Sequence, residues 1–272
     1  MDKDRIYTLA SDFLDNDAGN YLSAQDALRE DLVGMRMYGA PLMGCASAED
    51  PIFRELGCPE AASGEFRPPS FWLPQGRTVL SFFLPVCGEV AASNREDMSF
   101  PSPQWLHARM EGQNMIAKLT GYLCAALENE GYAAVAPLLD PRFTSRQGPQ
   151  VFGSNWSERH VAYACGLGTF GLSRGLITQK GMAGRITSLV TDLELEPDHR
   201  AYSAFDTYCM YCGACVRNCP VHAISLETGK DNVACSAFLD AVKETQAPRY
   251  GCGKCQVGVP CEHRNPAEKA LA

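Results

Sequence analysis

The spacing of apolar residues changes several times along the first third of the chain. Residues 2–16 carry apolar side chains at helical spacing, which predicts an N-terminal helix. A second, short helix is expected over 24–33, ending near Gly34. Residues 35–74 are rich in Gly, Pro and small side chains, and this composition predicts loops packed over a core.

An unbroken apolar run over 77–86 predicts a strand that is buried on both faces. A long amphipathic helix is expected over 105–130, started by Ser102 and Pro103. The next strand is expected over 133–139. Strand, long helix and strand in this order are typical of an α/β layered domain.

Three glycines follow a helical segment at 155–165. Gly166, Gly168 and Gly171 have the spacing G-x-G-x-x-G, but a dinucleotide-binding fingerprint follows a strand and opens a helix. Here the glycines follow a helix and lead into a predicted strand at 175–178, so we discount nicotinamide binding. Two interpretations remain: the glycines let the backbone approach something flat or bulky, or they form a tight helix-to-strand turn.

Residues 185–192 predict another strand, which we expect to pair with 176–179 across a Gly-Met-Ala-Gly turn. The acidic, proline-containing stretch at 194–198 reads as a linker. We therefore expect an α/β domain over 1–200 and a small cysteine-rich module over 201–272.

The strongest chemical signal is a run of four cysteines between residues 209 and 219, followed by Pro220. Its spacing, C-x2-C-x2-C-x3-C-P, is the bacterial ferredoxin pattern for [4Fe–4S] ligation. The first three thiolates bind one cubane, and the fourth usually serves another. A zinc site, which needs four ligands at one centre, is a distant alternative.

Four more cysteines follow, so that eight lie after residue 208, the number that two cubanes need. We interpret them as two sets of four. One set is Cys209, Cys212, Cys215 and Cys261, and the other is Cys219, Cys235, Cys252 and Cys255.

Composition limits the class of protein. Hydrophobic residues make up 46% of the chain and charged residues 21%, as in ordinary soluble domains. The net charge of −8 argues against a general nucleic-acid binder. The N-terminus lacks the apolar core of a signal peptide, and the 13 cysteines have metal-like spacing. We therefore expect a reducing compartment, the cytoplasm, and no membrane attachment.

The run Ala-Cys-Gly-Leu-Gly-Thr-Phe-Gly (164–171), the strand ending Ser-Leu-Val-Thr-Asp (188–192) and the cysteine pattern resemble the epoxyqueuosine reductase family and, more distantly, reductive dehalogenases. The resemblance implies a nitroreductase-like α/β (α+β) domain holding base-off cobalamin, followed by a small ferredoxin-like module with two [4Fe–4S] clusters. It also implies that the eight cysteines are the cluster ligands, in the two sets given. The cofactor contacts that it implies are Gly166, Gly168, Phe170, Gly171, Leu172, Ser173 and Arg174.

Two departures from the family pattern bear on the substrate. The family has an Asp proton donor upstream of the glycine turn, where this chain has Val-Phe-Gly-Ser at 151–154. The sequence also ends at Ala272, without the helical-repeat tail that binds tRNA in the family. We therefore expect a short paralogue that reduces a small molecule other than tRNA.

A reductase of this kind needs a proton donor, because reductive cleavage generates a basic leaving group. Glu158, His160 and Tyr163 lie just before the glycine turn and are the candidates, with His160 and Tyr163 on one helix face. The alternative for each is a solvated or packed structural residue. Lys254 and Arg249, near the second cysteine set, either tune a cluster or are surface charges.

Two function classes follow from these observations. The first is a cobalamin-dependent iron–sulfur reductase fed by an external low-potential electron donor. The alternative is a ferredoxin-type electron-transfer or activator protein that docks a corrinoid-carrying partner. A flavin is a third candidate cofactor, since nitroreductase-like domains commonly hold one.

Overall fold

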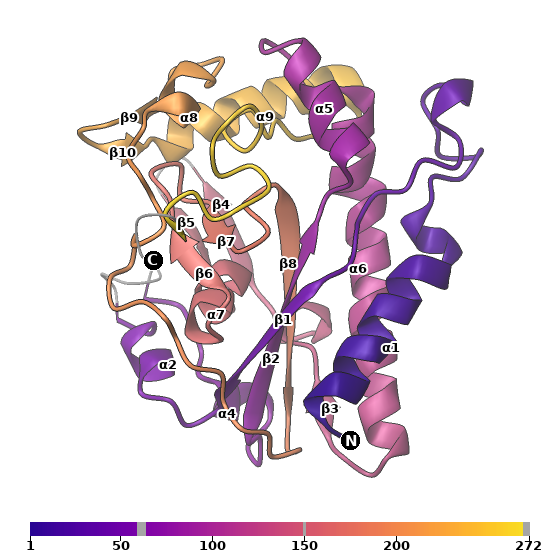
Figure 1. Cartoon of the computed structure of the whole chain (residues 1–272), viewed down its shortest axis with the longest axis vertical. Coiled ribbons are helices and arrows are strands. Elements are labelled where there is room, and N and C mark those ends of the chain that lie inside the picture. Colours follow the sequence, from indigo (N-terminus) through magenta and orange to yellow (C-terminus); the bar gives the residue numbers. More distant parts are fainter. Residues whose placement is uncertain (59–63, 149–150, 269–272) are drawn as a thin grey trace.

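The computed structural model describes residues 1–58, 64–148 and 151–268. A mixed α/β arrangement is organised on a four-stranded sheet in the order β1–β2–β8–β3, in which neighbouring strands are antiparallel (Figure 1). The strands are β1 (Leu42–Ser47), β2 (Thr78–Pro85), β3 (Ala134–Val135) and β8 (Gly184–Thr191).

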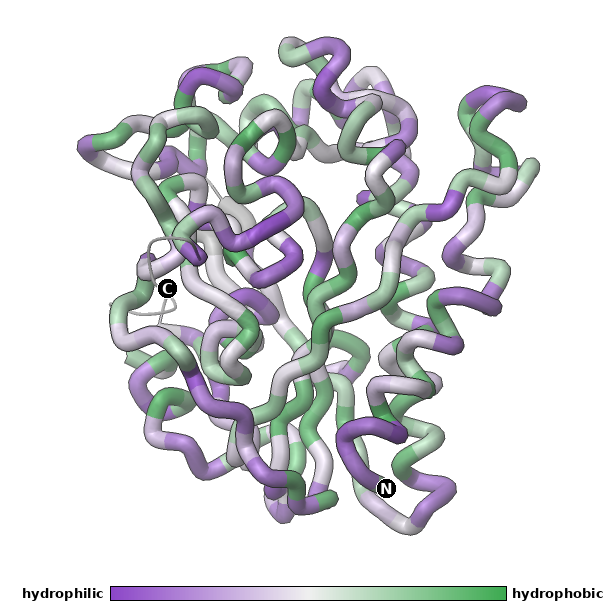
Figure 2. The backbone as a smooth tube through the Cα atoms, in the orientation of Figure 1, coloured by the Kyte–Doolittle hydropathy of each residue, from purple (hydrophilic) through white to green (hydrophobic). Residues whose placement is uncertain are grey.

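Helices cover both faces of this sheet. Leu80 and Leu84 of β2 pack with α1 (Lys3–Asn16) and α6 (Pro103–Asn129), whereas Val79 packs on the opposite face against α7 (Glu158–Ala164). The prediction of a doubly buried strand is confirmed. In Figure 2 the central strands are largely hydrophobic, and the hydrophilic residues lie mainly on the outer turns.

The two long helices begin as the sequence predicts. The Ser102 hydroxyl accepts a hydrogen bond from the Trp105 N–H at 3.2 Å, which caps α6, and Pro103 occupies its first turn. The Asp2 carboxylate caps α1 in the same way, through the Arg5 N–H at 2.8 Å. Both caps satisfy backbone donors that have no partner inside the helix.

The predictions for 24–33 and 35–74 are wrong in part. The first segment contains turns and a short 3-10 helix, Glu30–Leu32, in place of an α-helix. The second contains β1, whose small residues serve close packing: a Cβ on Gly44 would lie 2.3 Å from the Cys165 carbonyl oxygen. This close approach to the end of α7 explains the glycine in the middle of β1, which weakens the strand signal in the sequence.

The predicted partner of the 185–192 strand is also wrong. β8 pairs with β2 and β3, while β7 (Leu176–Thr178) pairs with β6 (Gly168–Phe170). Between β7 and β8 the backbone bonds to the C-terminal segment, Met182 N–H to the Cys261 carbonyl at 2.8 Å. The chain leaves the hairpin at this point and crosses to the central sheet.

The C-terminal elements lie across one end of the sheet, near α5 (Figure 1). No described helix has both the length and the apolar character needed to cross a membrane. The strand predicted over 133–139 is only two residues long and is followed by a 3-10 turn, Pro137–Leu139. The remaining elements are α2 (Ile52–Glu55), α4 (Pro69–Trp72), α5 (Gly88–Glu96), β4 (Ser145–Gly148), β5 (Val151–Ser154), α8 (Ala214–Arg217), β9 (Ile224–Ser225), β10 (Gly229–Lys230) and α9 (Asn232–Gln246), with a 3-10 turn at Ala18–Asn20.

Candidate functional site

The eight cysteines after residue 208 surround two neighbouring cavities, four at each. We call these cavities the first site and the second site. The grouping is the one that the sequence interpretation assigned. The first site has Cys209, Cys212, Cys215 and Cys261, and the second site has Cys219, Cys235, Cys252 and Cys255.

Local backbone geometry directs the cysteines toward these cavities. Gly213 has φ +70°, a left-handed conformation that turns the chain into α8 between the two sites. The Leu172 N–H donates to the Cys209 sulfur at 3.4 Å, and the Ala223 N–H donates to the Cys219 sulfur at 3.2 Å. Hydrogen bonds to cysteine sulfurs are among the features that tune iron–sulfur clusters.

The donor sets match cubane clusters better than single ions. In the described part of the chain, no group of three or more His, Cys, Asp or Glu side chains converges closely enough to hold one metal ion. The four ligands of a cubane bind four different irons, so they lie farther apart than the ligands of one zinc ion. Two sets of four thiols therefore fit two [4Fe–4S] clusters.

The two sites differ in their access to solvent. Cys212 of the first site is exposed, and the neighbouring Met210, Tyr211 and Phe205 are 57%, 48% and 53% exposed. In the second site no cysteine is exposed, and Cys219 is buried. Burial raises the pKa of one thiol in each site, Cys261 in the first and Cys252 in the second, to about 12. Thiols held protonated in this way must release protons when iron binds.

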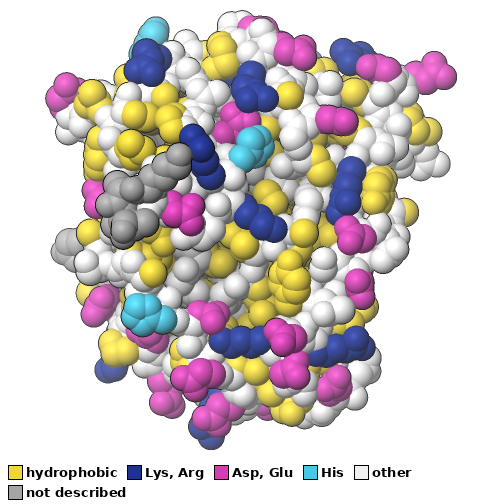
Figure 3. Space-filling model, viewed as in Figure 1, with side chains coloured by type: hydrophobic (Ala, Val, Ile, Leu, Met, Phe, Trp, Pro, Cys, Tyr) yellow, Lys and Arg dark blue, Asp and Glu magenta, His cyan; other side chains and the backbone are white. Residues whose placement is uncertain are grey.

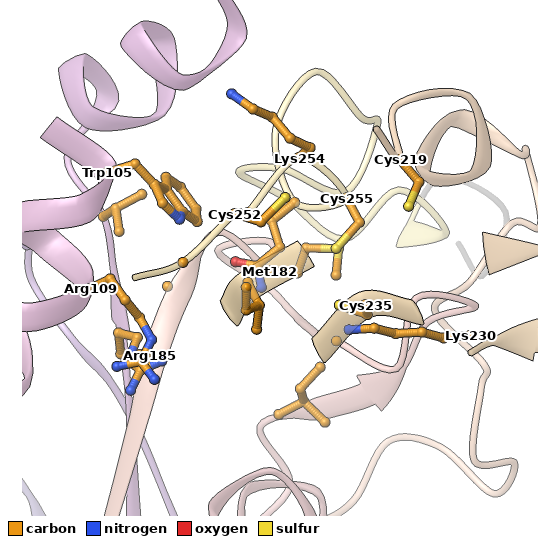
Figure 4. A pocket seen from close by; sticks show the side chains of 18 of the residues that line it. Trp105, Arg109, Met182, Arg185, Cys219, Lys230, Cys235, Cys252, Lys254 and Cys255 are labelled. Atoms are coloured by element: carbon orange, nitrogen blue, oxygen red, sulfur yellow. The ribbon is translucent and has the colours of Figure 1, made fainter. Parts of the chain in front are cut away.

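The second site is a cavity of about 230 Å³ between the C-terminal segment and the α6–β8 side of the central sheet (Figure 4). We call the whole of it the basic cavity, because cationic residues line it beside the four cysteines. Its walls combine apolar side chains, such as Phe83, Trp105 and Ile186, with five cationic residues. No Asp or Glu is among the described residues that line it. The cations are Arg109, Arg159, Arg185, Lys230 and Lys254.

Two arginines lie together on one wall of this cavity (Figure 4). Arg109 stacks 4.5 Å from the ring centre of Tyr250 and donates to the Tyr250 hydroxyl at 2.7 Å. Arg185 donates to the Gln113 side-chain oxygen, but its buried Nε has no partner among the described atoms. Burial, with repulsion from Arg109 and Arg159, lowers the pKa of Arg185 to about 10.

Lys254 is fully buried and holds the loop at residues 252–255, which we call the second cysteine loop, against α5. Its ammonium donates to the Asn94 backbone oxygen at 2.7 Å and to the Asn94 side-chain oxygen at 2.8 Å, while the Asn94 amide donates to the Cys252 carbonyl at 2.9 Å. In Figure 4 the Lys254 amine points away from Arg109 and Arg185. Its contacts are therefore those of a residue that positions the cysteine loop.

The same loop is fitted closely to α6. Gly253 has φ +70°, and a Cβ at this position would lie 2.1 Å from the Trp105 ring. Arg249, just before the loop, forms an ion pair with Glu111 of α6 at 2.7 Å. His107, also on α6, is fully buried and accepts a hydrogen bond from the Leu28 N–H at 3.1 Å, so it has a structural role.

The predicted proton donor Glu158 is not among the residues that line the cavity. Its Oε2 accepts a hydrogen bond from the Ser188 hydroxyl at 2.6 Å, and that hydroxyl accepts one from the Trp156 indole N–H at 2.8 Å. Its Oε1 is buried without a hydrogen-bond partner in the described chain. Burial raises the pKa of Glu158 to about 8, so the carboxyl is mostly protonated at neutral pH.

The other two predicted donors, His160 and Tyr163, pack into an aromatic cluster outside the cavity. Their rings lie 4.8 Å and 6.2 Å from Phe170, and Tyr163 also packs against Tyr202 and Phe205. Burial lowers the pKa of His160 to about 4, so its ring is neutral at pH 7. The structure thus separates the three candidates from the cavity, and their catalytic role remains a prediction.

Conformation and packing within the chain account for two of the three glycines of the turn. Gly166 has φ +81° at the end of α7, and a Cβ on Gly168 would lie 2.0 Å from the Ile177 carbonyl oxygen in the β6–β7 hairpin. A Cβ on Gly171 would lie 3.1 Å from the end of the Ile177 side chain, which can move, so packing does not require this glycine.

The remaining residues expected to contact a cofactor also lie away from the basic cavity. Gly171, Leu172 and Ser173 line the first site, Phe170 is buried against Phe205 with ring centres 4.3 Å apart, and Arg174 is exposed. The basic cavity is smaller than the roughly 300–1,000 Å³ pockets of drug-sized ligands, and a corrinoid is much larger than such ligands. The described residues therefore do not fit a bound corrinoid.

Sequence reasoning missed the basic cavity. Arg109, Arg159, Arg185 and Lys230 come from α6, α7, β8 and β10 and are far apart in the chain. Each stands alone in its own element, and no local motif links them. The packing of α6 and α7 against the sheet brings the three arginines together, and the docking of the C-terminal segment adds Lys230.

The two four-cysteine sites at one end of the central sheet identify the chain as an iron–sulfur protein. Residues 205–225 match the family described as 4Fe-4S binding domain. Tetrachloroethene reductive dehalogenases of Desulfitobacterium hafniense and Dehalobacter restrictus are 43% identical to the chain over 68 residues. This match covers 25% of the chain and only 12% of either dehalogenase.

Solved structures extend the similarity to most of the fold. A catabolic reductive dehalogenase superposes on 84% of the chain with a TM-score of 0.54 and 18% identity, and the match covers 30% of that protein. Epoxyqueuosine reductase from Bacillus subtilis superposes on 83% of the chain with a TM-score of 0.52 and 17% identity, covering 65% of that enzyme. The chain thus shares its fold with epoxyqueuosine reductases and reductive dehalogenases and spans only part of each.

Proposed function

We propose that the chain is an iron–sulfur oxidoreductase in which two [4Fe–4S] clusters pass electrons, one at a time, to a small acceptor in the basic cavity. The observation that carries this proposal is that the second set of four cysteines lines the same cavity as the cations. An acceptor bound there lies directly beside a cluster. The similarity to reductases supports an enzyme over a passive carrier.

The two sites have different roles in this proposal. Cys212 is exposed, so an external low-potential electron donor reaches the first cluster at this edge. Cys215 lies in the first turn of α8 and Cys219 two residues after its end, one in each set, so a single short segment connects the clusters. The second cluster then delivers the electrons to the cavity. A two-electron reduction takes its two electrons in sequence from the donor, and its protons come from water.

Cobalamin comes to this chain from the family resemblance alone, and the cavity does not fit it. We therefore derive no step through a corrinoid. The second candidate function is electron transfer to a separate corrinoid- or flavin-carrying partner. The exposed apolar residues Phe205, Met210 and Tyr211 beside the first site favour this alternative, because large exposed apolar side chains that lie together often mark docking surfaces.

Iron content and spectroscopy of cysteine variants test the proposal. After anaerobic reconstitution with iron and sulfide, we expect about eight irons per chain and two electron paramagnetic resonance signals on reduction. Cys212→Ser and Cys235→Ser each disrupt a different signal and lower the iron content by up to about four. Cys124→Ser, which alters a thiol on α6 outside both sites, is the matched control and keeps all the iron.

Three results would contradict the proposal or redirect it. About four irons in the unaltered chain would exclude the second cluster. Loss of the same signal in both variants would show that the two sets are wrongly divided. Cobalt or flavin retained tightly by the isolated chain would contradict the small-acceptor interpretation and restore the cofactor assignment.

A further inference from the structure

The charge of the basic cavity is opposite to that of the protein that surrounds it. The chain carries a net charge of −8, and acidic and basic side chains are interspersed on the surface in Figure 3. Inside the cavity, by contrast, the described lining contributes five cations and no carboxylate. Concentrating like charges in a partly desolvated space costs free energy unless anions bind there.

A cluster at the second site offsets only part of this charge. Four thiolates and an oxidised [4Fe–4S] core together carry about two net negative charges. The Lys254 ammonium points toward Asn94 and adjoins the cluster loop, so it is one of the cations that a cluster balances. The cavity is left with an excess of positive charge that another anion can neutralise.

The remaining cations have unused hydrogen-bonding capacity. Neither Arg159 nor Lys230 has a side-chain hydrogen bond or ion pair with any described residue. Arg159 is exposed, so water reaches its guanidinium, whereas the Arg185 Nε is buried without a partner. These residues are mounted on α7, β10 and β8, respectively. Planar guanidinium groups suit carboxylates, which accept two parallel N–H bonds.

We propose that this cavity binds a small organic carboxylate, with its charged end at Arg159, Arg185 and Lys230 and its apolar body against Phe83 and Ile186. The inference rests on the proposed function: the bound acid is the acceptor, its carboxylate is left unchanged, and an unsaturated bond in its apolar body takes two electrons from the clusters and two protons from water. The cavity of about 230 Å³ also holds the second cluster at its cysteine end, so only the space beside the cluster remains, which limits the ligand to a small acid.

Calorimetry with a charged probe and a neutral probe of similar size tests the inference. Benzoate and benzyl alcohol are titrated into the reconstituted, cluster-loaded chain in a buffer without other carboxylates. We expect benzoate to bind at least about 10-fold more tightly than benzyl alcohol, because it adds charge-assisted hydrogen bonds. Benzoate affinity should also fall with increasing salt.

Matched variants locate the binding site. Arg185→Gln and Arg159→Gln should each weaken benzoate binding about 10- to 100-fold and leave benzyl alcohol binding nearly unchanged. Arg54→Gln, which removes the same charge from the exposed side of α2, should change neither. Arg185→Lys keeps the charge and should recover part of the affinity, which separates loss of recognition from loss of folding.

The outcomes separate this inference from the proposed function. Absence of benzoate binding, equal binding of the two probes, or benzoate binding that Arg185→Gln and Arg159→Gln leave unchanged would overturn the anion site. If both clusters assemble in that case, the proposed function still stands. If iron analysis finds about four irons or fewer while benzoate binding still depends on Arg185, the two-cluster function fails and the anion site stands.

Discussion

Replacing Glu158 by Gln should stabilise the protein at neutral pH. The folded protein holds the pKa of Glu158 at about 8, against about 4.3 for an unfolded Glu. A raised pKa contributes stability that is fully present below pH 4.3 and is lost as the pH rises toward 8. Each pKa unit corresponds to about 1.4 kcal/mol, so by pH 7 the loss reaches about 3 kcal/mol.

Gln is the neutral counterpart of the protonated carboxyl. Its side-chain carbonyl can accept the Ser188 hydrogen bond at the position of Oε2, and it has no charge to desolvate. Near pH 4.5, Glu158→Gln and the unaltered chain should therefore have similar stability. At pH 7 the variant should melt roughly 6–12 °C higher, since about 1 kcal/mol shifts the melting temperature of a chain of this size by about 2–4 °C.

Thermal melting followed by circular dichroism from pH 4.5 to pH 8, under anaerobic conditions and at one scan rate, measures this difference. Glu128→Gln, which alters an exposed carboxyl on α6, is the control and should not change the slope with pH. Superimposable profiles for the Glu158→Gln variant and the unaltered chain would refute the reasoning. If the Glu158→Gln variant melts at the expected higher temperature but no longer reduces its acceptor, Glu158 is also the proton donor.

Three further changes test the anchoring of the second cysteine loop. Gly253→Ala should abolish the second cluster, with about four irons lost. The new Cβ would meet the Trp105 ring, and the residue has a positive φ that alanine disfavours. Gly88→Ala, where a Cβ meets open space, is the control for the iron analysis. Asn94→Ala should lower stability by about 2–3 kcal/mol in melting experiments, because buried Lys254 loses an acceptor; unchanged melting would contradict this. Lys254→Met should make the potential of the second cluster more negative in a redox titration, because a nearby positive charge is removed, while the first cluster keeps its potential.

The sequence patterns correctly predicted the elements that depend mainly on neighbouring residues in the chain. α1 and α6 follow from helical periodicity and their caps, and β2 follows from an apolar run buried on both faces. The pairing of β8 with β2 and β3 could not be read in this way, because it depends on contacts between segments about 55 to 113 residues apart. β1 escaped notice because the close approach of Gly44 to α7 requires a glycine in the middle of the strand, which weakens the strand signal in the sequence.

The candidate site, too, could be predicted from the sequence only in part. The first four cysteines follow from their fixed ferredoxin spacing, whereas the last four are irregularly spaced and their division between the two sets also rested on the family resemblance. The basic cavity has no such offsets, because Arg109, Arg185 and Lys230 are brought together by tertiary packing alone. Glu158, His160 and Tyr163 were correctly placed on one helix, but periodicity could not show that this helix turns them away from the cavity.

The close fit between the C-terminal loop and the sheet domain has a consequence for biogenesis. Cys252, Cys255 and Cys261, the last ligands of the two sets, lie on a segment held by Asn94 of α5 and by the backbone of Met182. Neither set of four can therefore close until the segments that carry Asn94 and Met182 have folded. Small zinc modules gain their fold from the metal; here we expect the order to be reversed, with iron–sulfur insertion a late step on a polypeptide that is already assembled.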